Sequence, residues 1–351
     1  MNCQLLMIDL GRNQLQGPVP RSLANCAMLE CLVLQNNQIE DTFPSWLGAL
    51  PKLELLILGS NKFYGEIGDP KNNSMFPKLR IIDLSCNDFS GHLPIEYIHN
   101  WNGMKMIYRE NLTYMHAVPQ IRFQLRAGPT THEAQIWTWG FTYEYSMKVV
   151  SKGTRRLYEK IQSTLVVVDL SNNTFVGDIP ESLGSLSGLQ SLNISNNKFT
   201  GVVPSSLAKL TELEALDLSQ NLLSGQIPWQ LTQLTFLSIL NVSHNQLTGP
   251  IPRGEQFDTF DNSSYDGNLG LCGVPLSKSC RNPMTSPPPL PIFRGRDLEF
   301  SRGIYWMVIA LGYGSGLVVG LVIGTTLTRR YHERFVDTFG RGKKFQKKTK
   351  S

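Results

Sequence analysis

Asparagine and cysteine are the residues of this sequence whose spacing could support chemistry. Cys272 and Cys280 lie eight positions apart in a short segment, which suits a disulfide bond in an oxidising compartment. Six asparagines stand in the Asn-X-Ser/Thr pattern that accepts N-linked glycans in exported proteins: Asn72, Asn111, Asn172, Asn193, Asn241 and Asn262. Both patterns predict a chain whose main part enters the secretory pathway.

The sequence shows no residue set that is typical of catalysis or of a metal or cofactor site. It has no Ser/His/Asp triad order and no Cys-X-X-Cys or His-Glu-X-X-His motif, and its six histidines are scattered. Gly314, Gly316 and Gly320 superficially resemble a dinucleotide-binding signature, but they lie in an apolar run and open no strand–helix unit. We therefore expect no enzymatic activity and no cofactor.

The charge of the chain is concentrated at its carboxyl end. The formal net charge is +5 over 351 residues, yet the last 24 residues alone carry nine basic and two acidic side chains. The preceding part therefore has a net charge of −2 and offers no basic surface for nucleic acid.

One phrase recurs along the chain: two apolar residues flank a third residue, and an asparagine follows after two more positions. The spacings between these asparagines are 24, 24, 26, 86, 24, 24 and 24 residues. The asparagines are Asn13, Asn37, Asn61, Asn87, Asn173, Asn197, Asn221 and Asn245.

Each residue type in this phrase has a predicted role. Because side chains alternate along a strand, the apolar pair should enter a core and the residue between should point outward onto a concave sheet. The amide of each recurring Asn can bond backbone groups of adjacent coils. A glycine and then a proline follow, and the proline is expected to hold the convex side extended. The pattern predicts an α/β-type repeat solenoid.

The repeat resembles the plant extracellular type of leucine-rich repeat, with the form L-x-x-L-x-x-L-x-L-x-x-N-x-L-x-G-x-I-P. The resemblance implies a horseshoe of short parallel strands. Four repeats, the first truncated, fill residues 1–99, and four more fill residues 163–258. Strands stacked ~4.8 Å apart would make a solenoid roughly 40 Å long.

The 86-residue step places an insertion at residues 100–162. It is rich in aromatic residues, so we expect it to fold against the solenoid rather than remain a linker. The stretches at residues 100–104 and 143–147 are similar to the island domain of plant receptor-like proteins. The insertion is interpreted either as a structural clamp between the repeat blocks or as part of a ligand site.

Residues 259–282, which include Cys272 and Cys280, resemble the carboxyl-terminal cap of the same family and would cover the apolar end of the stack. Four other cysteines are less informative. Cys3 and Cys26 could face each other on adjacent coils, but we predict no bond and interpret Cys26 as a small buried hydrophobe. The states of Cys31 and Cys86 stay open.

Residues 304–327 carry no charge over 24 positions and are predicted to form one transmembrane helix. A proline-rich juxtamembrane linker, 283–303, precedes them, and a basic tail, 328–351, follows. The excess of Lys and Arg on the carboxyl side predicts a cytoplasmic tail, extracellular repeats and a plasma-membrane location. Gly312, Gly316, Gly320 and Gly324 recur every four residues and would form a helix-packing face.

The resemblance as a whole identifies the chain as a plant leucine-rich-repeat receptor-like protein of the kinase-less, disease-resistance type. It implies an extracellular peptide, protein or glycan ligand, an adaptor receptor-like kinase bound through the transmembrane helix, and a ligand-dependent co-receptor kinase. By strand geometry, the candidate ligand-contacting residues are Arg80, Asp83, Glu214 and Asp217.

Three alternatives to an immune receptor remain: a developmental peptide receptor component, a secreted enzyme-inhibitor solenoid, and a non-functional truncated copy. Met1 begins inside a repeat and is followed by neither a signal peptide nor an amino-terminal cap. We therefore expect the carboxyl-terminal portion of a longer receptor.

Overall fold

The structure of the protein is a computed structural model. It describes residues 3–70, 75–106, 113–117, 120–125, 135–140, 143–144, 147–151, 154–158, 160–280 and 320. The chain divides into two units, Met1–Asn282 and Pro283–Ser351, and the first contains the repeats.

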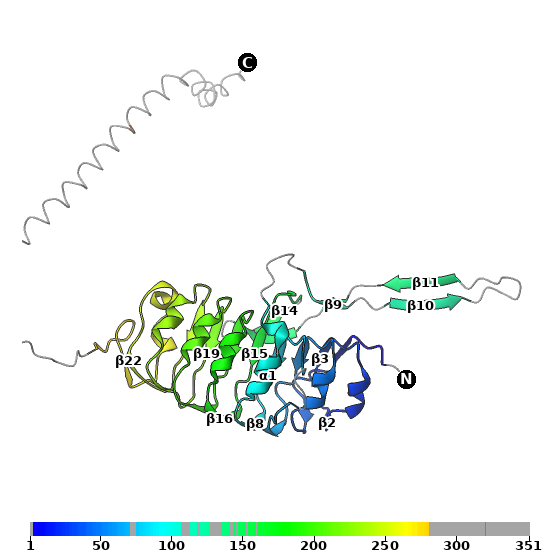
Figure 1. The fold of residues 1–351 in the computed structure, drawn as a ribbon, viewed down its shortest axis with the longest axis horizontal. Coiled ribbons are helices and arrows are strands. Elements are labelled where there is room, and N and C mark those ends of the chain that lie inside the picture. Colours follow the sequence, from blue (N-terminus) through cyan, green and yellow to red (C-terminus); the bar gives the residue numbers. More distant parts are fainter. Residues whose placement is uncertain are drawn as a thin grey trace, which may run out of the picture. The chain divides into compact units, whose positions relative to one another are not determined.

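Eight three-residue strands form one parallel sheet, one strand per repeat, in the order β1-β3-β5-β7-β15-β17-β19-β21 (Figure 1). Their bounds are β1 Met7–Asp9, β3 Cys31–Val33, β5 Leu55–Ile57, β7 Ile81–Asp83, β15 Val167–Asp169, β17 Ser191–Asn193, β19 Ala215–Asp217 and β21 Ile239–Asn241. The middle residue of each strand points into the core, as Leu56 and Leu216 do. This confirms the predicted parallel-strand solenoid.

Short strands after each asparagine form further sheets beside the main one. β6 (Tyr64–Glu66), β8 (Asp88–Gly91), β16 (Thr174–Asp178) and β18 (Lys198–Thr200) make a four-stranded sheet. β2 (Gln16–Gly17) pairs with β4 (Gln38–Ile39), and β20 (Ser224–Gly225), β22 (Gln246–Pro250) and β23 (Gly270–Cys272) make a third group. Near the end of β16, Gly177 has a φ of +81°. A residue with a Cβ atom would be strained in this backbone conformation.

Short helices return most coils to the main sheet, although none lies between β6 and β7 among the described residues. Most are five-residue 3₁₀ helices: η1 Arg21–Asn25, η2 Ser45–Ala49, η4 Glu181–Ser185, η5 Ser205–Lys209 and η6 Trp229–Gln233. The helix α1 (Ile95–Asn100) takes this place before the insertion. Each follows directly on a proline, such as Pro180 or Pro204. The prolines themselves are extended, as expected, with ψ of 136° at Pro180 and 133° at Pro204, but the chain turns into a helix at the next residue.

The recurring asparagines bond the coils to one another. Asn197 Nδ2 donates to the carbonyl oxygens of Ile194 and Ser195 in its own coil and of Leu170 in the preceding coil, each at 3.1 Å. Its Oδ1 accepts the Phe175 N–H at 3.1 Å. The same pattern holds from Asn37 to Asn245, whereas Asn13 bonds only within its own coil. Asn268 continues the series in the cap, which the 24-residue spacing did not reveal.

The core runs without a break across the insertion. Phe63, Phe89, Phe175 and Phe199 stack in one column, with ring centroids 5.9, 6.3 and 6.2 Å apart. The step from Phe89 to Phe175 joins the two repeat blocks. β7 and β15 are therefore neighbours in the sheet although the whole insertion lies between them in sequence.

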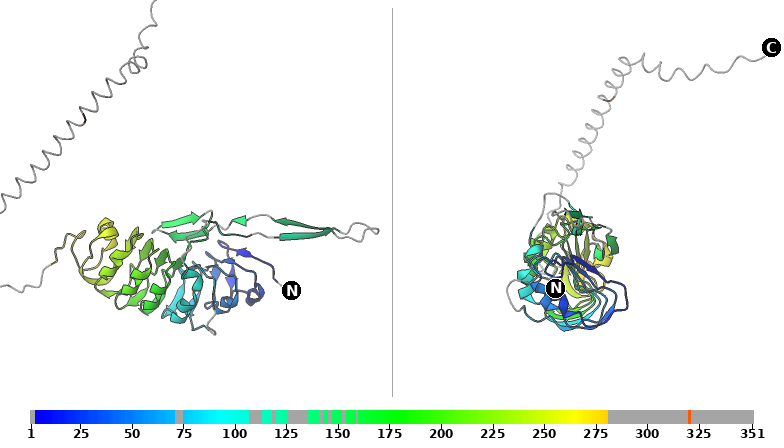
Figure 2. Two further views of the ribbon diagram at one scale, coloured as in Figure 1. Left: turned by 45° about the horizontal axis from the view of Figure 1, so that its top comes forward. Right: turned by 90° about the vertical axis from the view of Figure 1, so that its right-hand side faces the viewer.

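The insertion contributes antiparallel strand pairs on one side of the repeats (Figure 2). β10 (Gln120–Leu125) pairs with β11 (Gln135–Gly140), β9 (His116–Ala117) with β12 (Tyr143–Glu144), and β13 (Met147–Ser151) with β14 (Thr154–Tyr158). A short helix, η3 (Asn102–Met104), precedes them.

The carboxyl end of the stack is closed by η7 (Glu255–Thr259), η8 (Asn262–Ser264) and β23. Phe257, Tyr265 and Leu271 are buried there. The predicted transmembrane helix, its linker and the basic tail lie outside the described residues apart from Gly320. Within the described part of the chain, no helix has both the length and the apolar character that crossing a membrane requires.

Candidate functional site

The two ends of the insertion pair with each other and form a stem, which we define as residues 113–117 and 160–165. Met115 N donates to Ile161 O at 2.7 Å, and Ser163 N donates to Thr113 O at 2.8 Å. The hydroxyls of Thr113 and Ser163 lie 2.7 Å apart. The stem is therefore a defined element and not a loose connection.

The stem packs on the concave face of the first repeat block. Met115, Ile161 and Leu165 are buried in one cluster with outward-pointing strand residues, separate from the main core. We call these strand residues the apolar seat: Cys31, Val33, Leu55, Ile57, Ile81 and Val167. All six are buried, so this part of the concave face is an internal interface.

Two of the four candidate ligand residues lie beside this interface. Arg80 is 8% exposed and Asp83 is 3% exposed. The expectation that they lie on an open ligand surface was based on strand alternation alone. Alternation gives the outward direction of Asp83, which ends β7, but Arg80 precedes this strand, and alternation could not show what covers either side chain.

The other two candidates lie on a less covered part of the sheet. Glu214 and Asp217 are half-buried, as are Ile239 and Asn241 on the adjoining strand. We call these four residues the open strip. It is the part of the second block where concave side chains are accessible.

A feature that the repeat phrase did not predict is a serine two residues after the outward polar residue. Asp217 Oδ1 accepts the Ser219 N–H at 3.0 Å and the Ser219 hydroxyl at 2.6 Å. Asp83 with Ser85, Asp169 with Ser171, and Asn193 with Ser195 repeat these two bonds. The Asp/Asn-X-Ser spacing was a readable signal. One oxygen of each outward side chain is thus occupied at the strand end.

Asp169 is a buried acid of the concave face. It is 1% exposed and pairs in register with Asp83 across β7 and β15. Burial, and to a lesser extent the negative charge of Asp83, raise the pKa of Asp169 to about 7, although the bonds from Ser171 and an interaction with the Asn193 side chain act to lower it. Asp169 lies between the two apolar residues of its repeat, which is the position expected to point outward.

The sequons differ in their exposure. Asn172 and Asn262 are exposed, Asn241 is half-buried, and Asn72 and Asn111 lie outside the described residues. Asn193 is only 8% exposed. Its Oδ1 accepts the Ser195 hydroxyl at 2.7 Å, so the residue that completes the sequon also holds the asparagine in place.

Four of the cysteines form two disulfides. Cys272 is bonded to Cys280 in the cap, and Cys3 is bonded to Cys26. The interpretation of Cys26 as an unpaired hydrophobe was therefore wrong, because the first two coils bring the two sulfur atoms together. Cys31 is a buried thiol whose pKa is raised, mainly by burial. Cys86 is an exposed thiol.

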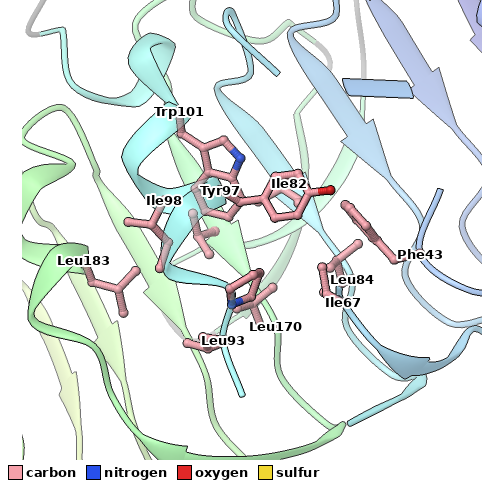
Figure 3. Close-up of a pocket in the computed structure, with 12 residues that line it drawn as sticks. Phe43, Ile67, Ile82, Leu84, Leu93, Tyr97, Ile98, Trp101, Leu170 and Leu183 are labelled. Atoms are coloured by element: carbon pink, nitrogen blue, oxygen red, sulfur yellow. The ribbon is translucent and has the colours of Figure 1, made fainter. Parts of the chain in front are cut away.

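A small cavity lies beneath α1, where the two repeat blocks meet (Figure 3). Its volume is about 20 Å³, enough for about one water molecule. The lining is almost wholly apolar and includes Ile82, Leu93, Tyr97, Trp101 and Leu170. It is a packing gap of the core and not a site for an organic ligand. Within the described residues, no group of three or more acidic, histidine or cysteine side chains could hold a metal ion.

Comparison with known families agrees with the repeat stack. The family model described as "Leucine rich repeat" matches residues 163–223, and a second model of that description matches residues 28–50 and 236–255. The fold and these matches define a leucine-rich-repeat protein.

Two relatives from Arabidopsis thaliana narrow this class. Receptor-like protein 34 is 47% identical over 350 residues, covering 98% of this chain and 34% of the relative. Receptor-like protein 43 is 47% identical over 343 residues, covering 96% of this chain and 44% of the relative. The chain belongs to the plant leucine-rich-repeat receptor-like proteins, and it spans less than half the length of these two relatives.

Solved structures share the fold. The ectodomain of the receptor kinase GASSHO1/SCHENGEN3 from Arabidopsis thaliana, in complex with CASPARIAN STRIP INTEGRITY FACTOR 2, has a TM-score of 0.51 and 27% identity, covering 78% of this chain and 28% of that chain. A plant ice-binding protein has a TM-score of 0.51 and 22% identity, covering 79% of this chain and 76% of that chain. The second match shows that this solenoid also serves proteins with another function.

Proposed function

We propose that this chain is part of a cell-surface receptor that senses an extracellular ligand and signals through a partner receptor kinase. The observation that carries the proposal is the match to receptor-like proteins at 47% identity over nearly the whole chain. That match includes the repeats, the insertion and the carboxyl-terminal segment, so it concerns the order of parts as well as the repeat itself.

We assign ligand contacts to the open strip and to the insertion beside it. The apolar seat is already filled by the stem, so a ligand would reach it only by displacing Met115 and Ile161. The stem therefore acts as a clamp, and recognition belongs to surfaces that the clamp leaves free. The ligand would be a peptide, protein or glycan, and the related ectodomain solved with a bound factor supports a binding role.

Signalling is assigned to the segment after the cap. We propose that residues 304–327 span the plasma membrane with the repeats outside, and that Gly312, Gly316, Gly320 and Gly324 let an adaptor receptor-like kinase approach closely. A ligand-dependent co-receptor kinase would complete the complex. The family favours perception in plant immunity, and a developmental peptide receptor is the alternative. A secreted enzyme-inhibitor solenoid would lack the anchored segment.

The test is kinase recovery from plant cells that express the full chain behind a signal peptide. We expect Gly316→Leu with Gly320→Leu to reduce receptor-kinase co-purification at least about tenfold at equal surface expression, because two Leu side chains separate the helices. Gly314→Leu is the control for each single substitution, since it adds one Leu side chain away from the four-residue register.

Equal kinase recovery from the double variant and from the control would refute the glycine face. Recovery of no receptor kinase with the unaltered chain would refute signalling through a kinase. Release of the unaltered chain into the medium would instead support the secreted solenoid.

A further inference from the structure

Asp83 and Asp169 form a buried carboxyl pair where the two repeat blocks join. They end β7 and β15 and are register partners in the parallel sheet. Their side chains therefore leave the same face of neighbouring strands, which lie about 4.8 Å apart. Both are almost fully buried.

The second oxygen of Asp169 lacks the bonding that the first oxygen has. Oδ1 accepts from the Ser171 amide at 3.0 Å and from the Ser171 hydroxyl at 2.7 Å. Oδ2 is buried and makes no well-formed hydrogen bond with the described residues, although an interaction with the Asn193 side chain acts to lower the pKa of Asp169. A buried carboxylate oxygen without a donor is costly when charged, whereas a protonated oxygen carries no charge and can itself donate.

The pair lies next to the apolar seat. Ile81 and Val167, the outward residues two positions earlier on the same strands, pack in one cluster with Met115 and Ile161 of the stem. Other charged or titratable groups on the surrounding elements are Glu54 before β5, Arg80 before β7, Asp217 on β19, and His116 and Lys160 on the stem. A docked stem excludes water from the seat, and the two carboxyl groups lie two positions further along the same face of β7 and β15.

We propose that the Asp83–Asp169 pair is a proton-dependent latch for the stem of the insertion. When the stem is docked, the pair retains one proton, and loss of this proton favours release of the stem from the seat. An undocked Asp169 would meet water and titrate as an ordinary carboxyl group, so docking takes up a proton.

The direction of the pH effect follows from this proton uptake. The pKa of Asp169 is raised from 3.8 to about 7 in the docked structure. Docking is therefore strongest below the ordinary pKa and weakens as the pH rises toward about 7. For one proton the docking equilibrium constant falls by up to about tenfold per pH unit in this interval. A latch of this kind is closed in an acidic extracellular space and opens as the medium becomes more alkaline.

The test is backbone hydrogen exchange of the stem in the full chain, purified in detergent and compared at about pH 5.5 and about pH 7.5 after correction for intrinsic exchange. We expect protection of residues 113–117 and 160–165 to fall at least about tenfold in the unaltered protein. Asp169→Asn, which resembles the protonated acid, should keep its protection at both pH values.

Asp217→Asn is the matched control. Asp217 makes the same two bonds to Ser219, but its register partners are Asn193 and Asn241 rather than an acid. This variant should show the full pH effect. Asp83→Asn should weaken the effect, because it removes the neighbouring charge, and it provides the same test if Asp169→Asn does not fold.

An undiminished pH effect in Asp169→Asn, or in Asp83→Asn where the first variant does not fold, would overturn the latch. Equal loss of the effect in Asp217→Asn would also overturn it, because the strand-end motif in general would then be responsible. None of these outcomes bears on whether a kinase is recruited.

Discussion

The two repeat blocks share one backbone design but have different concave faces. In the first block the outward strand positions are mainly apolar, as at Val33 and Ile57, and the stem buries them. In the second block Asn193, Asp217 and Asn241 take these positions, and exposure increases toward β21. The inward strand positions of both blocks are buried, apart from the partly buried Ile8 on the terminal strand β1. The repeat pattern therefore determines the solenoid backbone and its core. The polarity of the outward residues between the pattern positions reflects whether another segment covers the sheet.

This difference assigns two roles to two parts of the concave sheet: holding the insertion and, as proposed, contacting a ligand. The apolar face holds the insertion in place, and the polar face next to it is partly exposed at β19 and β21. A concave solenoid can thus carry an internal interface and an external surface on one continuous sheet, because each strand contributes only two outward side chains.

The largest expected effect comes from placing a carboxylate on the concave face of each block, which tests whether the two faces differ in burial. We expect Ile57→Asp to lower the free energy of unfolding by ~3–5 kcal/mol, because Ile57 is fully buried under the stem and an unpaired charge is costly there. Ile239→Asp, at the equivalent surface of the second block, should cost less than ~1 kcal/mol. Thermal unfolding of the secreted repeats would measure both. Similar losses would mean that the two faces do not differ in burial.

A second prediction concerns the shared frame. Asn61 and Asn221 lie in different blocks, and each bonds three carbonyl oxygens and one N–H. We expect Asn→Ala at either position to cost a similar ~2–3 kcal/mol, because each leaves backbone groups unsatisfied. Asn13→Ala, which removes bonds within one coil only, should cost less. Denaturant unfolding would show whether one block depends on its asparagine more than the other.

The smallest expected effect concerns glycan occupancy. Asn172 and Asn262 are exposed sequons, and we expect both to carry glycans in protein made through the secretory pathway. Asn193 should stay largely bare, because its side chain is buried and bonded to Ser195. Mass spectrometry of glycopeptides would measure site occupancy. Full occupancy of Asn193 would mean that the sheet near β17 is more open than this structure.

The sequence by itself determined the frame. Alternation placed Leu56 and Leu216 in the core, and the spacing of the asparagines gave the number of coils. These features were readable because they are local: a strand has a period of two, and one coil contacts mainly the next. The insertion and the cap were also predicted from their sequences.

The tertiary structure alone decided which outward residues are covered. Arg80 and Asp217 have equivalent predictions from sequence, yet one is buried beside the stem and the other is partly exposed. The bond between Cys3 and Cys26, the register of Asp83 with Asp169 and the raised pKa of Asp169 likewise depend on segments that are distant in the chain. Burial, and therefore charge state, is a property of what packs on a residue. The repeat pattern predicts the direction in which a side chain points. It does not predict which segment packs against that side chain on the concave face.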